Sequence, residues 1–149
     1  MSFVLKKSVW VPRPIEEVFA FFGDAANLEQ MTPPWLQFKI LTPQPIPMRP
    51  GTLIDYRISL RGLPMKWRTE ITTWNPPFEF VDEQLKGPYR KWHHRHTFVE
   101  RDGGTEVGDE VTYDVLGGAL IRHLFVKGDL EKIFAFREQT LKQRFVARP

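Results

Sequence analysis

Residues 9–24, Val-Trp-Val-Pro-Arg-Pro-Ile-Glu-Glu-Val-Phe-Ala-Phe-Phe-Gly-Asp, join the end of a strand to the start of a helix. Alternation of apolar and polar residues over 3–11 predicts the strand. Pro14 suits the first turn of a helix, and apolar residues follow at helical spacing until Gly23 stops it. Asp24 can then cap a second short helix over residues 24–30. The chain therefore opens with one strand and two short helices.

The middle of the chain is predicted to be a meander of strands. A short run at Leu36, Phe38 and Ile40 is followed, between residues 52 and 115, by about five alternating runs separated by turn sequences. Consecutive strands joined by short turns pair antiparallel, which predicts a sheet of about seven strands. The loop 43–50 holds four prolines in eight residues and must be stiff and extended. It is either a connector at the sheet edge or a rim over a pocket.

A long helix is predicted at the carboxyl end, from about Asp129 to about Val146, after a short helical piece that reaches Phe125. Its apolar face holds Leu130, Ile133, Phe134, Leu141 and Phe145. An antiparallel sheet buries one face, and this helix remains to cover it. The expected fold class is α+β, with a curved antiparallel sheet wrapped around the helix in a single domain over residues 1–149.

Composition excludes several classes of function. The 149 residues contain no cysteine, which rules out disulfides, thiolate catalysis, iron–sulfur clusters and cysteine-based zinc sites. The net charge of +3 is spread along the chain without a run of five like charges, so no nucleic-acid partner is expected. No apolar stretch is long enough to span a membrane, and residues 1–12 lack a signal-peptide core. We therefore expect no integral membrane association and a cytoplasmic location.

Residues 92–98, Trp-His-His-Arg-His-Thr-Phe, carry the most informative chemistry. On a strand, Trp92, His94, His96 and Phe98 share one face, and their aromatic bulk predicts that it is the inner one. The same parity turns inward Phe78, Phe80, Asp82 and Gln84 on the strand before, and Val107, Asp109, Val111 and Tyr113 on the strand after. Arg137 falls on the buried stripe of the last helix.

These inward polar residues have three interpretations. In the first, Arg137 pairs with Asp109 or Asp82, and the histidines complete an internal network that ties helix to sheet. In the second, they line a wet, amphipathic cavity for a small molecule, where Arg137 could hold a carboxylate or enolate. The first two are compatible, because a network that lines a cavity can also bind a ligand.

The third interpretation is a metal ion held by His94 and His96, with Asp109 as the third ligand. An isolated His-x-His pair is a weak signal, so neither a metal nor another cofactor is predicted. His123 is expected at the surface.

The chain resembles the START/polyketide-cyclase/SRPBCC superfamily, and within it a bacterial ligand-binding subgroup. The resemblance rests on residues 9–24 with Asn27-Leu28, on 80–84, on Gly87-Pro88-Tyr89, on the 92–98 motif, on Gly104-Thr105, on 109–113 and on 133–137. It implies the helix-grip fold and a deep cavity between the sheet and the last helix. Together with the parity argument, it places at a ligand site Tyr56, Trp67, Phe80, Asp82, Gln84, Trp92, His94, His96, Phe98, Asp109, Tyr113, Phe134 and Arg137.

Three functions follow as hypotheses. The first is non-catalytic binding or carriage of a small, largely hydrophobic or amphipathic molecule, such as a lipid, a quinone or a polyketide-like compound. The second is a cyclase or dehydratase in which His94 or His96 is the general acid–base, Asp109 orients it and Arg137 steadies an oxyanion. The third is a protein-interaction module that uses the proline-rich loop.

Overall fold

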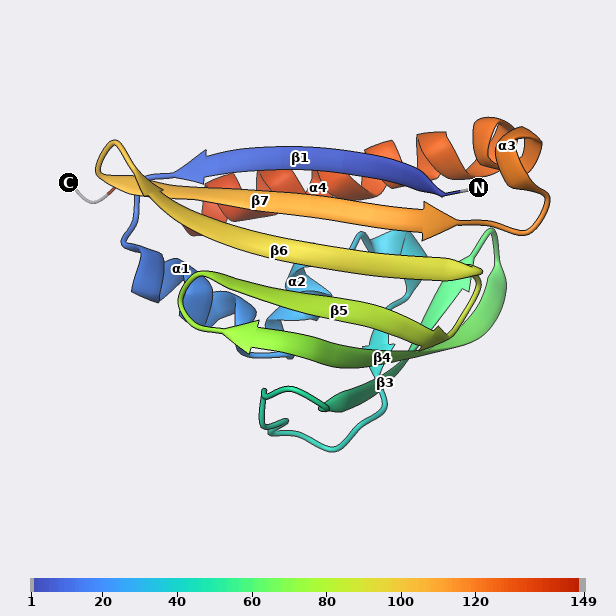
Figure 1. Ribbon diagram of the computed structural model, residues 1–149, viewed down its shortest axis with the longest axis horizontal. Coiled ribbons are helices and arrows are strands. Elements are labelled where there is room, and N and C mark those ends of the chain that lie inside the picture. The colour runs from blue at the N-terminus through green and yellow to red at the C-terminus, as the bar shows by residue number, and fades with distance from the viewer. Residues whose placement is uncertain (1, 148–149) are drawn as a thin grey trace.

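Seven antiparallel strands form one sheet in a computed structural model that describes residues 2–147 (Figure 1). Their order across the sheet is β1-β7-β6-β5-β4-β3-β2, so every strand after β2 pairs with the next along the chain and β7 closes back on β1. The strands are β1 (Phe3–Val11), β2 (Lys39–Ile40), β3 (Leu53–Leu60), β4 (Leu63–Asn75), β5 (Glu79–Lys86), β6 (Lys91–Arg101) and β7 (Gly104–Asp114). This is the meander that the alternating runs predict.

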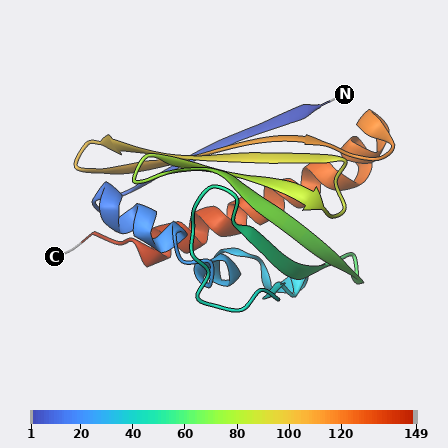
Figure 2. The ribbon, with the colours of Figure 1, turned by 60° about the horizontal axis from the view of Figure 1, so that its bottom comes forward.

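The helices gather on one face of this sheet, and α4 runs along the face from end to end (Figure 2). Two short helices follow β1, and a continuous helical stretch with one π-helical turn, η2, ends the described chain. The helices are α1 (Ile15–Phe22), α2 (Asn27–Met31), η1 (Pro34–Leu36), α3 (Gly118–Ile121), η2 (Arg122–Val126) and α4 (Lys127–Arg144). A curved antiparallel sheet that holds a long carboxyl-terminal helix is the helix-grip fold.

Three local predictions were wrong. Leu36 lies in η1 rather than in a strand, because the two prolines before it favour a tight turn, and β2 begins only at Lys39. Phe78 is 58% exposed, since it belongs to the turn before β5, where strand parity does not apply. Asp129 is not an N-cap, because the helix already runs through η2 and Lys127.

Two apolar clusters hold the helices against the sheet. The larger one packs α1 on β1, β6 and β7, with Phe98 and Val107 almost fully buried beneath Phe19 and Phe22. The smaller one packs the first half of α4, including Phe134, on the far half of β7. A third, smaller cluster packs Ala25 against Ile40 and Ile54 of β2 and β3, and an open space remains between β3, β4, α2 and α4. Within residues 2–147 no helix is both long and apolar enough to cross a membrane.

Candidate functional site

A mostly apolar cavity of about 180 Å³ lies between the sheet, α2 and α4. Strands β3 and β4 supply aliphatic and aromatic walls, and α2, η1 and the proline-rich loop supply Leu28, Met31, Leu36 and Met48. From α4, Leu130, Ile133 and Phe134 face it. Asp82, His94, His96 and Arg137 form one polar group in the lining, and other polar lining residues include Tyr56, Thr69, Asp24 and Thr32. An apolar chamber with a few grouped polar side chains has the usual composition of a small-molecule site.

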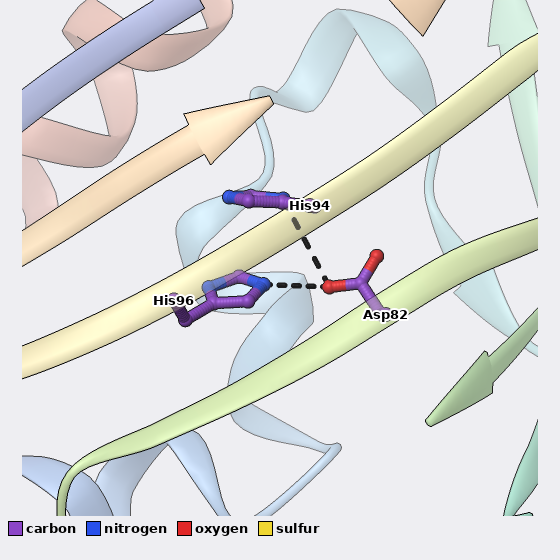
Figure 3. Close-up of side chains that lie close together, drawn as sticks. All are labelled: Asp82, His94 and His96. Atoms are coloured by element: carbon purple, nitrogen blue, oxygen red, sulfur yellow. Dashed lines mark hydrogen bonds and ion pairs between the residues drawn. The ribbon is translucent and has the colours of Figure 1, made fainter. Parts of the chain in front are cut away.

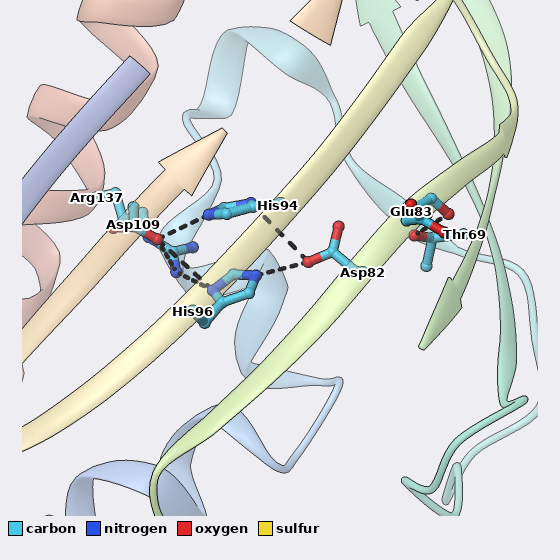
Figure 4. Close-up of polar contacts among 7 residues, drawn as sticks. All are labelled: Thr69, Asp82, Glu83, His94, His96, Asp109 and Arg137. Atoms are coloured by element: carbon cyan, nitrogen blue, oxygen red, sulfur yellow. Dashed lines mark hydrogen bonds and ion pairs between the residues drawn. The ribbon is translucent and has the colours of Figure 1, made fainter. Parts of the chain in front are cut away.

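Strand register brings these polar groups together from three strands (Figure 4). Asp82 is directly opposite His94, and His96 is directly opposite Asp109. The hydrogen bonds run diagonally: His96 Nε2 lies 2.6 Å from Asp82 Oδ2, and His94 Nε2 lies 2.8 Å from Asp109 Oδ1. Arg137 reaches down from α4 and places Nη2 3.3 Å from Asp109 Oδ1 and 3.2 Å from His96 Nδ1. The predicted internal network therefore exists, and Arg137 pairs with Asp109.

The neighbours of each histidine decide which ring nitrogen carries a proton. Arg137 can only donate, so His96 Nδ1 must accept, and the proton of a neutral His96 sits on Nε2 and is donated to Asp82. Asp109 accepts from Nε2–H of His94. That leaves the Nδ1 atom of His94 facing Asp82 Oδ2 at 3.9 Å, longer than a hydrogen bond.

Burial and charge act in opposite directions in this network. Burial lowers the pKa of His96 to about 4, with repulsion from His94 adding to it, although Asp82 favours the charged form. Burial alone would raise the pKa of Asp109, but the Arg137 guanidinium and the His94 hydrogen bond lower it overall. The pKa of Asp82 is likewise lowered, because the hydrogen bond from His96 and the nearby positive groups outweigh burial. Two carboxylates, Asp82 and Asp109, therefore share this network with the Arg137 guanidinium and a neutral His96.

Asp82, His94 and His96 also present one ligand atom each within 4.8 Å of one another (Figure 3). A metal ion bound by two imidazoles lies close to both ring planes. Here the rings of His94 and His96 are stacked at 3.7 Å with only 25° between their planes, so their lone pairs do not converge. Arg137 Nη2 adds a positive charge 3.2 Å from His96. Asp109, the third ligand that the sequence favoured, lies on the other side of both rings, so this arrangement fits a hydrogen-bonded network better than a metal centre.

Comparison with known proteins adds a family to this geometry. A family model described as polyketide cyclase / dehydrase and lipid transport matches residues 11–136. The chain belongs to this family. A comparison with curated proteins finds no significant match.

Solved structures similar to this family member share its fold at low identity. Protein Ms6760 from Mycobacterium smegmatis is 18% identical with a TM-score of 0.70, covering 95% of this chain and 89% of that one. The di-domain ARO/CYC BexL from the BE-7585A biosynthetic pathway is 21% identical with a TM-score of 0.72, and the match covers 99% of this chain and 51% of that one. A nucleoside-diphosphate sugar epimerase from Corynebacterium glutamicum is 23% identical with a TM-score of 0.67, and the match covers 93% of this chain and 28% of that one. At these identities the likenesses show a shared helix-grip fold.

In this family member the structure brings most of the predicted site residues to the cavity wall. Those that line it are Tyr56, Trp67, Phe80, Asp82, Trp92, His94, His96, Phe134 and Arg137. Asp109 lies behind the histidines and lines a smaller cavity of about 110 Å³ between β1 and α4, which Arg137 also lines.

Three other predicted residues face inward without lining the cavity. Gln84 holds the β5–β6 turn by bonding both backbone atoms of Tyr89, at 2.6 and 3.1 Å. Phe98 packs edge-on against Phe19 and Phe22 of α1. Tyr113 packs on Phe3, and its hydroxyl accepts from Arg122. Parity identifies the inner face correctly, but helix packing decides which part of that face stays open.

Sequence reasoning missed a second group of wall residues, among them Ile54, Ile58, Thr69 and Ile71. Strand alternation carries the signal for them, because they share parity with Tyr56 on β3 and with Trp67 on β4. For Leu28 and Met31 no such signal exists, since their position depends on how α2 docks near α4.

Proposed function

We propose that the protein binds a small, largely hydrophobic molecule in the cavity between the sheet and α4. The observation that carries the proposal is a largely apolar lining that also contains a connected group of polar side chains at Asp82, His94 and His96. Apolar walls supply affinity through removal of surface from water, and grouped polar atoms orient the ligand. Membership of a cyclase and lipid-transport family supports the same class of ligand.

The size of the chamber favours a compact ligand. An apolar cavity of roughly 150 Å³ is enough to hold benzene, as engineered examples in other proteins show. The chamber of about 180 Å³ therefore fits one or two fused rings in its present shape. A long acyl chain would extend past the mouth or require the walls to move.

The polar group in the lining favours a ligand that donates a hydrogen bond. Asp82 Oδ2 is already held by His96, whereas Oδ1 accepts no hydrogen bond in the described part of the chain. Arg137 contacts both Asp109 and His96 through Nη2, so its charge is already balanced by a carboxylate, although its buried Nε has no hydrogen-bond partner in the described residues. A hydroxyl or phenol facing Asp82 therefore suits the site better than a carboxylate does.

Three probes of equal ring size test this: 2-naphthol, naphthalene and 2-naphthoate, titrated while tryptophan fluorescence is followed. We expect 2-naphthol to bind most tightly and 2-naphthoate least. Asp82→Asn should weaken the binding of 2-naphthol at least ~10-fold, since a hydrogen bond to a charged group is worth roughly 1.5–3 kcal/mol, and should leave the binding of naphthalene unchanged. Asp55→Asn is the matched control, because Asp55 pairs with Arg68 away from the cavity. Absence of binding by both 2-naphthol and naphthalene would refute the proposal.

A second candidate is acid–base catalysis on a bound ketone or polyketide-like molecule. The observation in its favour is His94, whose Nε2–H is fixed by buried Asp109 while its Nδ1 faces Asp82 at the cavity wall. One nitrogen held by a carboxylate and the other left with a lone pair is the arrangement of a general base. Such a base would take a proton from carbon next to a carbonyl and return one from solvent.

Exchange in heavy water tests this second candidate with 2-acetylnaphthalene as the probe. If His94 is a base, wild-type protein should speed deuterium incorporation into the methyl group, as measured by NMR, and the His94→Gln/His96→Gln double variant should lose that effect. Asp55→Asn serves again as the control. Equal exchange rates in wild type and double variant would exclude a role for both histidines.

A further inference from the structure

An exposed apolar surface surrounds α3 and the π-helical turn η2, at the end of the molecule where this segment projects beyond the sheet (Figures 1 and 2). No residue of α3 or η2 is buried. Large apolar side chains are instead open to solvent: Leu116 is 76% exposed, Leu120 66% and Leu124 56%. Leu120 and Leu124 are four residues apart and share a helix face. Within the described residues, no helix or strand packs over these three leucine side chains.

The β3–β4 hairpin extends the same surface. Arg61, at its tip, donates to the carbonyl oxygen of Phe125 at 3.3 Å and stacks over the Phe125 ring at 5.2 Å. Leu63, two residues further along, is 63% exposed. We define the apolar end surface as Leu63, Leu116, Leu120, Leu124 and Phe125. Contiguous exposed apolar groups of this kind commonly mark an interaction site.

Positive charges outnumber negative ones around the apolar end surface. Residues 60–66 and 115–128 contain no aspartate or glutamate, while they carry Arg61, Lys66, Arg122 and Lys127, with His123 beside them. Asp129, just beyond, is paired with Arg61 at 3.2 Å. Leucines flanked by lysine and arginine are the composition of segments that lie in the interface of an anionic bilayer.

We propose that the apolar end surface docks on anionic lipid bilayers, with Leu120 and Leu124 entering the interface and Lys66 and Lys127 meeting lipid phosphates. The hairpin that carries Leu63 also supplies Leu60 to the cavity wall, so docking would set the bilayer beside the cavity. The docking proposal does not depend on the cavity holding a ligand, and the two can fail separately.

Co-sedimentation with lipid vesicles tests the proposal on the full chain. Wild-type protein should bind vesicles of phosphatidylcholine with about one quarter phosphatidylglycerol at low salt, and much less at high salt or with phosphatidylcholine alone. Leu120→Gln/Leu124→Gln should lower the partition constant for vesicles at least ~10-fold, because the variant lacks the two leucine side chains whose removal from water favours docking. Lys66→Glu/Lys127→Glu should abolish the preference for anionic lipid.

The matched control is Leu41→Gln/Leu53→Gln, which makes the same change at leucines that are 42% and 45% exposed, just after β2 and at the start of β3, away from α3. It should bind vesicles like wild type. Thermal melts check that each variant is folded, and 2-naphthol titration checks that the cavity is intact in the Leu120→Gln/Leu124→Gln variant.

Two results would overturn the proposal. One is wild-type protein that stays in the supernatant with anionic vesicles at low salt. The other is self-association in the absence of lipid that the Leu120→Gln/Leu124→Gln variant loses, which would make the surface a contact between two copies of the chain. Wild-type protein that binds anionic vesicles but does not bind 2-naphthol would count against the ligand proposal alone.

Discussion

His96 is the residue whose environment departs furthest from that of a surface histidine. It is 4% exposed, stacks on Phe80 at 4.0 Å, and uses both ring nitrogens in hydrogen bonds. Phe80 is its direct cross-strand partner, so the stack follows from register alone. Because Arg137 donates to Nδ1, a second proton on the ring would face a guanidinium, and the neutral form is the one that fits.

Stability should therefore depend on pH through His96. The unfolded chain binds this proton near pH 6.5 and the folded chain only near pH 4, so the unfolded state holds more protons between these values. The free energy of unfolding should fall by roughly 3 kcal/mol as the pH drops through this window, at ~1.4 kcal/mol per pKa unit. Urea unfolding at a series of pH values measures it.

The variant for this prediction is His96→Gln, whose amide can donate to Asp82 and whose oxygen can accept from Arg137 without titrating. This variant should flatten the plot of unfolding free energy against pH between pH 6.5 and pH 4. His123→Gln changes an exposed histidine and should leave the curve as it is. The lowered pKa values of Asp82 and Asp109 contribute only below about pH 3.8, outside this window. Parallel curves for wild type and His96→Gln would show that another group carries the dependence.

At the scale of elements, the β6–β7 hairpin must approach β1 closely. A Cβ atom at Gly104 would lie 2.3 Å from the carbonyl oxygen of Val11 and 2.6 Å from the Trp10 ring. Val11 is paired with the neighbouring Thr105, whose hydroxyl donates to the Arg13 carbonyl oxygen at 2.8 Å. The hairpin therefore anchors the strand-to-helix junction that opens the fold.

Gly104→Ala should lower the melting temperature, because the backbone of β1 has to shift to admit the methyl group. Gly128→Ala is the matched substitution in α4, where a Cβ meets nothing within 4 Å. Since alanine favours a helix over glycine by about 1 kcal/mol, that variant should be at least as stable as wild type. Differential scanning calorimetry of both proteins would detect the opposite signs, and a stabilising Gly104→Ala would contradict the close approach.

For the whole molecule, a ligand in the cavity should act as a stabiliser. The core clusters leave a space open between β3, β4, α2 and α4. A molecule that binds only the folded state adds about 2.7 kcal/mol at a concentration 100 times its Kd. Saturating 2-naphthol should therefore raise the melting temperature by several degrees, and much less in Asp82→Asn. An unchanged melting temperature in wild type would show that 2-naphthol does not bind the folded protein in preference to the unfolded chain.

Much of this arrangement could be predicted from the chain. Alternation with period two follows from strand geometry, so Trp92, His94 and His96 had to share a face, and the stripe of α4 had to include Arg137. The order of elements and the antiparallel meander followed from turn sequences and from the need to cover one face of the sheet. Family membership rests on the same residues.

Long-range packing decided the hydrogen-bond partners of the polar residues and the position of the cavity. Parity placed Asp82 and Asp109 inward, but diagonal register and the reach of Arg137 chose their partners and put Asp109 behind the histidines. Parity also failed at Phe78 and Leu36, where turns interrupt the strands. The cavity exists because α2 and α4 cover the inner face of β3 and β4 without filling the space beside it. Alternation is a property of the local backbone, whereas an open volume depends on how elements distant in sequence meet.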